Sequence, residues 1–304
     1  MQFRQLYSHY QTQIEVQQLY KNLKLFGFNK VELCSDGNIV ITYLLLDEGL
    51  MKISNNYVQP TVPQPTFDVQ NKSIFNNSGL EIFASYNYSR GNADIIRHTI
   101  YKEDLIQERQ TYDHSWNTLY GISCDKSTYA YDTNNRLISE TITKNLSTSS
   151  FAVNDYETFI SEMSSEFNVT TVEVKRYEYK DNTVYMIDES GNSVAIYTEL
   201  KTPTNWSREY LDKNNKPEAI RTITFDDANR IIQIKQDILV RPKDNKEEVF
   251  VYNTNGNFVE RHRNISNLRF KEEFVYENNL LIKVVSNGND DYNSTFEYKY
   301  SLSE

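Results

Sequence analysis

The sequence predicts a mainly β protein: an array of antiparallel β-hairpins forming an extended curved sheet, with an N-terminal helix and one short inserted helix. Three observations lead to this class. A phrase of aromatic residues, a polar turn and aliphatic residues recurs along the chain. The 23 Tyr and 15 Phe supply large side chains that suit a pleated, half-buried surface. Asn and Asp gather between the apolar runs, where turns are expected.

The recurring phrase explains why each segment forms a hairpin. Its best copies are residues 129–138 and 223–232, and looser copies are residues 249–259 and 274–282. Side chains alternate along a strand, so the rings of Tyr129 and Tyr131 in the first copy point to one face. Asp132 is placed to accept hydrogen bonds from its own downstream amides, and Asn135 or Gly256 tolerates the left-handed conformation that closes the turn. A single hairpin is marginal alone, so neighbouring hairpins are expected to pair. This assigns the tyrosines to packing in preference to a ligand-binding stripe.

The segments before the array carry their own signals. Apolar residues at helical spacing predict a helix over about residues 11–26, ended by Gly27. Asp-Gly within residues 35–38, flanked by apolar runs, predicts a tight hairpin. The Pro- and Asn-rich residues 55–77 predict a long loop or an irregular edge segment.

Two interruptions and one boundary complete the predicted organisation. A capping pattern and helical spacing predict the inserted helix over residues 155–167. An extra turn is expected at residues 189–192. We divide the chain into residues 1–80, with the helix, the hairpin and the Pro-rich loop, and residues 81–304, with the repeats, the two parts being continuous in one sheet.

The repeated phrase resembles a known family motif. Tyr131-Asp132-x-x-Asn135-Arg136-Leu137 and Phe225-Asp226-x-x-Asn229-Arg230-Ile231 look like the YD repeat of RHS-type proteins, whose consensus is Tyr-Asp-x-x-Gly-Arg-Leu. The likeness covers roughly residues 86–300, with Asn in place of the usual turn Gly and with irregular spacing. The resemblance implies a sheet built from YD-like hairpins and an association with polymorphic toxin loci. This chain is too short to form the toxin-enclosing shell of that family.

Charge and composition restrict the partners and the location. The formal net charge of −10 disfavours nucleic acid and anionic membrane surfaces. It suits a basic protein partner, although acidity also simply favours solubility. The N-terminal segment does not resemble a signal peptide, the longest apolar run is too short to span a bilayer, and the two cysteines form no CxxC pair. These observations predict a cytoplasmic protein.

A search for catalytic chemistry finds no specific signal. The four histidines form no zinc motif, and Arg261-His262-Arg263 is interpreted as a solvated strand face. Cys124 is interpreted as a buried inert thiol, and Asp226-Asp227 is explained by its turn. The sequence therefore predicts no catalytic residue, no metal site and no cofactor.

The leading functional hypothesis is a non-enzymatic protein-binding module. With the YD resemblance, its most specific form is a bacterial immunity protein, or antitoxin, that neutralises a polymorphic toxin by covering a basic domain. Glu260 and Glu272 are the predicted partner-binding residues, because both lie on expected strands beside YD-like turns. The alternative is a surface or secreted carbohydrate-binding or adhesive protein, in which tyrosines, Trp116 and Trp206 stack on sugars. A hydrolase on a β scaffold has no specific support.

Overall fold

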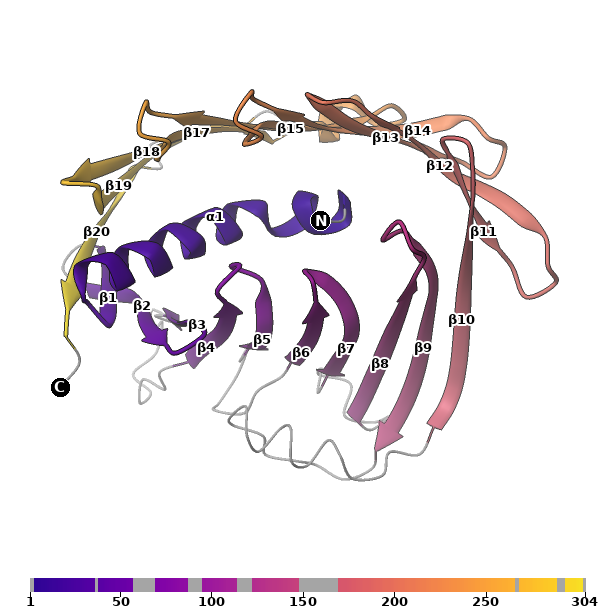
Figure 1. Ribbon diagram of the computed structural model, residues 1–304, viewed down its shortest axis with the longest axis horizontal. Helices are drawn as coiled ribbons and strands as arrows, with labels where there is room; N and C mark the ends of the chain where they lie inside the picture. Colours follow the sequence, from indigo (N-terminus) through magenta and orange to yellow (C-terminus); the bar gives the residue numbers. More distant parts are fainter. Residues whose placement is uncertain are drawn as a thin grey trace, which may run out of the picture. The chain divides into compact units, whose positions relative to one another are not determined.

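The computed structural model of the chain is dominated by antiparallel strands (Figure 1). It describes residues 3–35, 38–56, 69–86, 95–113, 122–147, 169–265, 268–288 and 293–302. Within these residues lie one α-helix, 20 strands and one short 3-10 helix. The prediction of a mainly β protein with an N-terminal helix is therefore confirmed.

The elements follow one another in chain order. They are α1 (Phe3–Phe26), β1 (Lys30–Ser35), β2 (Asn38–Leu46), β3 (Gly49–Asn56), β4 (Val69–Asn76), β5 (Glu81–Tyr86), β6 (Ile95–Lys102), β7 (Leu105–Asp113), β8 (Ile122–Tyr131), β9 (Leu137–Ser147), β10 (Val169–Lys180), β11 (Thr183–Ile187), β12 (Ser193–Lys201), β13 (Asn205–Leu211), β14 (Pro217–Phe225), β15 (Ile231–Ile238), η2 (Pro242–Asp244), β16 (Lys246–Tyr252), β17 (Phe258–Ile265), β18 (Leu268–Glu277), β19 (Leu280–Gly288) and β20 (Asn293–Ser301).

The predicted open, extended sheet is wrong, because the strand pairing closes. Each strand pairs with its neighbours in sequence, and β1 pairs with β20 as well as with β2. The last contacts of this seam include the backbone hydrogen bond from Asn29 to Ser301, at 3.4 Å, and the ring contact of Phe28 with Tyr300. A closed sheet leaves no strand edge unpaired. Hairpin patterns predict pairing only between strands that are consecutive in the sequence. They could not predict the pairing of the first strand with the last.

The chain divides into two compact units, which are described separately. Unit 1 comprises residues 10–174 and 299–304, with most of α1 and with β1 to β9. Unit 2 comprises Gln2–His9 and Lys175–Tyr298, with β11 to β19. Strand β10 begins in unit 1 and ends in unit 2, and β20 begins in unit 2 and ends in unit 1.

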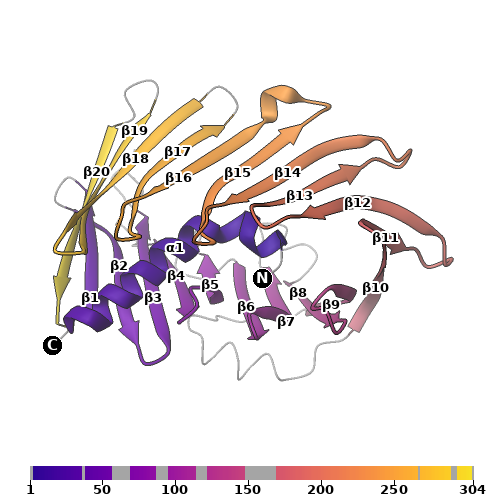
Figure 2. The ribbon, with the colours of Figure 1, turned by 45° about the horizontal axis from the view of Figure 1, so that its top comes forward.

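Unit 1 is organised around α1, which lies along β1 to β5 (Figures 1 and 2). Its Val16, Leu19 and Leu23 are fully buried. The helix is tied to the β4–β5 turn, because Gln13 and Gln17 donate hydrogen bonds to the Ser78 carbonyl at 3.1 and 2.7 Å. These contacts fix α1 against the sheet through both apolar packing and polar anchors.

The helix ends as its sequence predicts. Gly27 has a φ of +75°, and the Phe28 amide donates to the Leu23 carbonyl at 3.0 Å, which is the Schellman arrangement. The helix begins earlier than predicted, at Phe3. Phe3, Leu6, Tyr7 and Tyr10 continue the helical spacing towards the N-terminus, a signal that the prediction did not include.

Two other predictions for unit 1 are corrected or untested. The long loop over residues 55–77 is wrong in part, because Val69–Asn76 is β4 and pairs with β3 and β5. Its Ile74 and Phe75 supply the apolar residues of a strand, a signal that the neighbouring prolines hid. The inserted helix over residues 155–167 lies outside the described residues.

Unit 2 is a run of long hairpins with regular registers. The buried side chains of one face lie in register across the strands, as in the row Trp206, Ile223 and Ile234. Because successive side chains alternate, this register defines a second, opposite face for every strand of the unit. The side chains of Glu260 and Glu272 lie on different faces of this sheet.

Candidate functional site

The YD-type turns use their acidic residue for structure. In the turn after β8, Asp132 Oδ1 accepts hydrogen bonds from the Asn134 and Arg136 amides, both at 2.9 Å, and Asn135 has a φ of +61°. The Arg136 guanidinium pairs with the second carboxylate oxygen at 2.6 Å. The predicted roles of Asp132 and Asn135 are confirmed.

The same turn recurs at four further places in unit 2. In each, an Asp or Asn side chain accepts from the amide four residues later, and the residue before that amide has a positive φ; the accepting residues are Asp188, Asp212, Asp226 and Asn253. The first of these is the predicted extra turn at residues 189–192. The prediction missed the two-residue turn of Glu103 and Asp104, both with positive φ, because the pair contains neither the Gly nor the Asn that usually marks such a turn.

The tyrosine of the phrase bridges adjacent hairpins. A register shift precedes the turn, between Ala130 and Tyr131 in one copy and between Val251 and Tyr252 in another. There the tyrosine hydroxyl donates to a backbone carbonyl of the preceding hairpin. The four bridges are Tyr101 to Glu81 at 3.2 Å, Tyr131 to Ile106 at 2.7 Å, Tyr252 to Ile231 at 3.0 Å and Tyr276 to Phe258 at 2.8 Å. These hydroxyls stabilise the sheet where strands separate.

The turn carboxylates give folding a defined acid dependence. Hydrogen bonds from the Asn192 side chain and amide lower the pKa of Asp188, and the Lys216 amide lowers the pKa of Asp212. A carboxyl with a depressed folded-state pKa stabilises the fold above its unfolded value, about 3.9 for Asp, and this contribution disappears as the pH falls through the folded-state pKa.

We therefore expect the melting temperature to fall as the pH drops below about 4. Asp188→Asn with Asp212→Asn should flatten this fall while leaving the melting temperature at pH 7 little changed, because an amide oxygen serves as the acceptor in the Asn253 turn. Thermal melts from pH 7 to pH 2 provide the measurement. An unchanged acid slope in the double variant would show that other carboxyls cause it.

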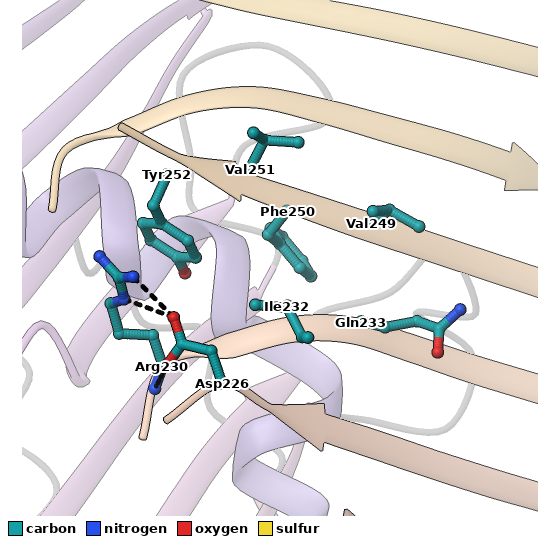
Figure 3. Close-up of a pocket in the computed structure, with 8 residues that line it drawn as sticks. All are labelled: Asp226, Arg230, Ile232, Gln233, Val249, Phe250, Val251 and Tyr252. Atoms are coloured by element: carbon teal, nitrogen blue, oxygen red, sulfur yellow. Dashed lines mark hydrogen bonds and ion pairs between the residues drawn. The ribbon is translucent and has the colours of Figure 1, made fainter. Parts of the chain in front are cut away.

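An open cleft of about 500 Å³ lies between β15 and β16, where the two strands separate (Figure 3). Ile232 and Phe250 form its apolar part, and Arg230 lies over the Tyr252 ring at 4.5 Å. Arg230 is held by Asp226 at 2.7 Å. Because Asp226 and Arg230 already pair with each other within the YD-type turn, we interpret the cleft as a consequence of the hairpin geometry of the repeat.

The two predicted partner-binding residues lie on opposite faces of unit 2. Glu260 is paired in register with Glu273, whereas Glu272 is paired with Arg261. The Glu260 side chain is 35% exposed and contacts His262 at 3.0 Å. The Glu272 side chain is only 14% exposed and forms an ion pair with Arg261. The structure does not bring the two glutamates together. Glu272 was expected to face solvent, but its side chain is largely buried.

Arg261 was missed by sequence reasoning. The run Arg261-His262-Arg263 was interpreted as a solvated face, but alternation turns Arg261 and Arg263 to one face and His262 to the other. The Arg261 side chain is 1% exposed, with Glu248 at 3.9 Å and Glu272 as its ion-pair partners. Burial lowers the pKa of its guanidinium, which Glu272 partly offsets. Hydrophobic periodicity does not distinguish a buried Arg from an exposed one. The burial of Arg261 becomes evident only from the residues on the two strands that pair with β17.

The remaining candidate residues give no catalytic arrangement. Among the described residues, no group of three His, Cys, Asp or Glu side chains is placed to hold a metal ion. Asp226 lies in its YD-type turn, as predicted. Cys34 is a buried free thiol, and the side chain of Cys124 lies outside those described.

Comparisons with known proteins give distant similarities in structure. The chain is similar to a porin-like protein from Bacteroides uniformis ATCC 8492, with 9% identity and a TM-score of 0.29 over 90% of this chain and 96% of that chain. It is also similar to a chain of TcdB2-TccC3-TEV, with 10% identity and a TM-score of 0.26 over 85% of this chain. A chain of the Photorhabdus luminescens Tc holotoxin pore matches with 10% identity and a TM-score of 0.26 over 92% of this chain.

The two toxin matches concern only a small part of each toxin chain. The chain spans 19% and 17% of the length of the two toxin chains. No family model matches the sequence, and no curated protein matches it. At such identities and TM-scores the comparisons assign neither a family nor an activity.

The predicted cytoplasmic location is wrong. It was inferred from the N-terminal segment, the shortness of the apolar runs and the cysteine usage, and none of these signals detects a closed antiparallel sheet of 20 strands, the architecture that outer-membrane barrels also have. In the described part of the chain, none of the helices combines the length and the apolar character needed to cross a membrane.

Proposed function

We propose that the protein is a non-enzymatic protein-binding module that recognises a basic partner through strands β16 to β19 of unit 2. The observation that carries this proposal is a row of four side chains in register across β16 to β19, the Glu260 row: Val251, Glu260, Glu273 and Val285. It combines two carboxylates with aliphatic groups on a sheet face. Such a mixture of charge and apolar surface suits a protein partner.

The electrostatics of the row favour a cationic partner. Glu260 and Glu273 are directly opposite each other, and like charges in that position repel. Lys271 lies between them, at 2.6 Å from Glu273 and 3.5 Å from Glu260. The side chains of Glu273 and Glu260 are 44% and 35% exposed, respectively. Basic groups of a partner would relieve the same repulsion.

The YD-type turns and the resemblance to RHS-type repeats suggest a toxin domain as the partner, with neutralisation by covering its basic site. The carbohydrate-binding alternative gains no specific observation. Trp206 is 8% exposed, and the tyrosine hydroxyls of the repeat are engaged with backbone carbonyls.

The test is association of the purified protein with a basic toxin domain encoded beside its gene. Glu260→Lys with Glu273→Lys should slow association about tenfold at low salt, and added salt should slow the wild type in the same direction. Glu178→Lys, a reversal at another exposed strand position of unit 2, is the matched control. Glu272 is unsuitable because its reversal would disturb the buried Arg261.

Two outcomes would contradict the proposal at different levels. Absence of binding to every toxin domain encoded nearby rejects the toxin-binding module. Binding that is unaffected by salt and by both reversals rejects the Glu260 row as its surface.

A further inference from the structure

One end of unit 2 combines exposed apolar and basic side chains. The connections from β13 to β14, from β15 to β16 and from β17 to β18 all lie at this end, because antiparallel strands reverse direction at every turn (Figure 2). Neighbouring connections touch, since the Leu239 amide donates to the Glu218 carbonyl at 2.9 Å. Lys246 and Leu268 are both paired with Ile265. We call residues 212–218, 239–246 and 268–269 the basic rim.

Three large apolar side chains project from the basic rim. Leu239 is 45% exposed, Val240 is 63% exposed and Leu268 is 46% exposed. Leu239 and Val240 are consecutive and lie between the end of β15 and the short helix η2. In a strand, alternation would turn one of two such neighbours towards the packed face. The exposure of both therefore marks an apolar tip that stands outside the packed face of unit 2.

The cations of the basic rim outnumber its carboxylates. Six exposed cationic residues belong to it: Lys213, Lys216, Arg241, Lys243, Lys246 and Arg269. It contains three carboxylates. Asp212 accepts backbone amides of its own turn, Asp244 lies 3.4 Å from Arg241, and Glu218 is exposed. The Arg241 side chain remains 70% exposed beside Asp244. The rim is therefore cationic, although the chain as a whole is acidic.

The other end of the same strands has a different composition. The YD-type turns there, residues 226–230 and 253–257, consist of Asp, Asn, Ala, Thr and Gly with one Arg, and neither contains a large apolar residue. Both ends close antiparallel hairpins of the same sheet. Turn geometry alone therefore does not require Leu, Val and Lys at the basic rim.

We infer that the basic rim is a docking surface for an anionic lipid bilayer. Anionic headgroups attract cations within about 8–10 Å at moderate salt, so the local charge of the rim counts more than the net charge of −10 of the whole chain. The tip formed by Leu239 and Val240 is suited to enter the boundary between headgroups and acyl chains. This inference does not rest on the proposed function.

A bilayer also matches the extent of the rim. Neighbouring strands lie about 4.8 Å apart, so the rim extends roughly 25 Å from β13 to β18. A broad surface contacts the tips of three adjacent hairpins together. Stable attachment to a membrane commonly combines an apolar contact with a polybasic one, and the rim supplies both.

The test is cosedimentation of the full chain with phosphatidylcholine vesicles prepared with and without phosphatidylserine. We expect binding to the vesicles that contain phosphatidylserine, and we expect it to weaken as salt rises. Arg241→Gln with Lys243→Gln should weaken this binding roughly tenfold. Leu239→Ser with Val240→Ser should weaken it several-fold, because the apolar contact is lost.

The matched control is Lys180→Gln with Lys201→Gln, which removes two exposed cations beside turns at the other end of the strands. It changes the net charge by the same amount and should leave vesicle binding unchanged. All the substituted side chains are exposed, so every variant should keep the wild-type melting temperature. No binding to phosphatidylserine vesicles, equal binding to phosphatidylcholine alone, or an equal loss in the control would overturn the inference.

Discussion

Arg261→Ala is expected to destabilise the protein by about 3–5 kcal/mol, because it leaves a mostly buried carboxylate without its cation. The Arg261 side chain is 1% exposed and that of Glu272 is 14% exposed. Their ion pair offsets the desolvation of both groups, and removal of one partner leaves the other charge buried and uncompensated. Chemical denaturation at pH 7 measures the change.

The companion variants separate charge from shape. Glu272→Ala should also destabilise, although less, since Glu248 at 3.9 Å still faces Arg261. Arg261→Met with Glu272→Leu replaces the pair by apolar groups of similar length and should recover most of the lost free energy of unfolding. His262→Ala, on the opposite and more exposed face, is the control and should change little. A mild Arg261→Ala effect, equal to the control, would show that Arg261 is readily hydrated.

The local elements of this fold follow closely from the sequence. The positions of Asp132, Asn135, Asp226 and Gly27 predicted turns and a helix end that the structure contains, because each depends on a few neighbouring residues. Turn chemistry of this kind is decided by side-chain hydrogen bonds and by tolerance of positive φ.

The global features did not follow from the sequence. The pairing of β1 with β20 joins the two ends of the array, and no local signal encodes a contact at that separation. The burial of Arg261 and the exposure of Glu260 differ because the two residues are neighbours on one strand and face opposite sides. Charge alone does not distinguish the glutamates of β18, and only the register places Glu272 opposite Arg261 and Glu273 opposite Glu260.

Tyr131→Ala is expected to cost about 2–4 kcal/mol, through loss of a large ring and of its hydrogen bond. The Tyr131 hydroxyl donates to the Ile106 carbonyl at 2.7 Å, beside a register shift where the ladder between β7 and β8 has ended. Tyr131→Phe keeps the ring and removes only the bridge, so it should cost about 1 kcal/mol. The difference between the two variants assigns the remainder to packing.

The same logic predicts a pattern across the repeat. Tyr252→Phe and Tyr276→Phe remove equivalent bridges to Ile231 and Phe258 and should have effects close to that of Tyr131→Phe. Tyr185→Phe, in which the ring lies beneath Lys180, is the control for loss of a hydroxyl elsewhere. Denaturant unfolding of the five variants measures these terms. If the three bridge variants unfold with the wild-type midpoint, the tyrosine of the YD phrase contributes through its ring alone, and its hydroxyl is available for another role.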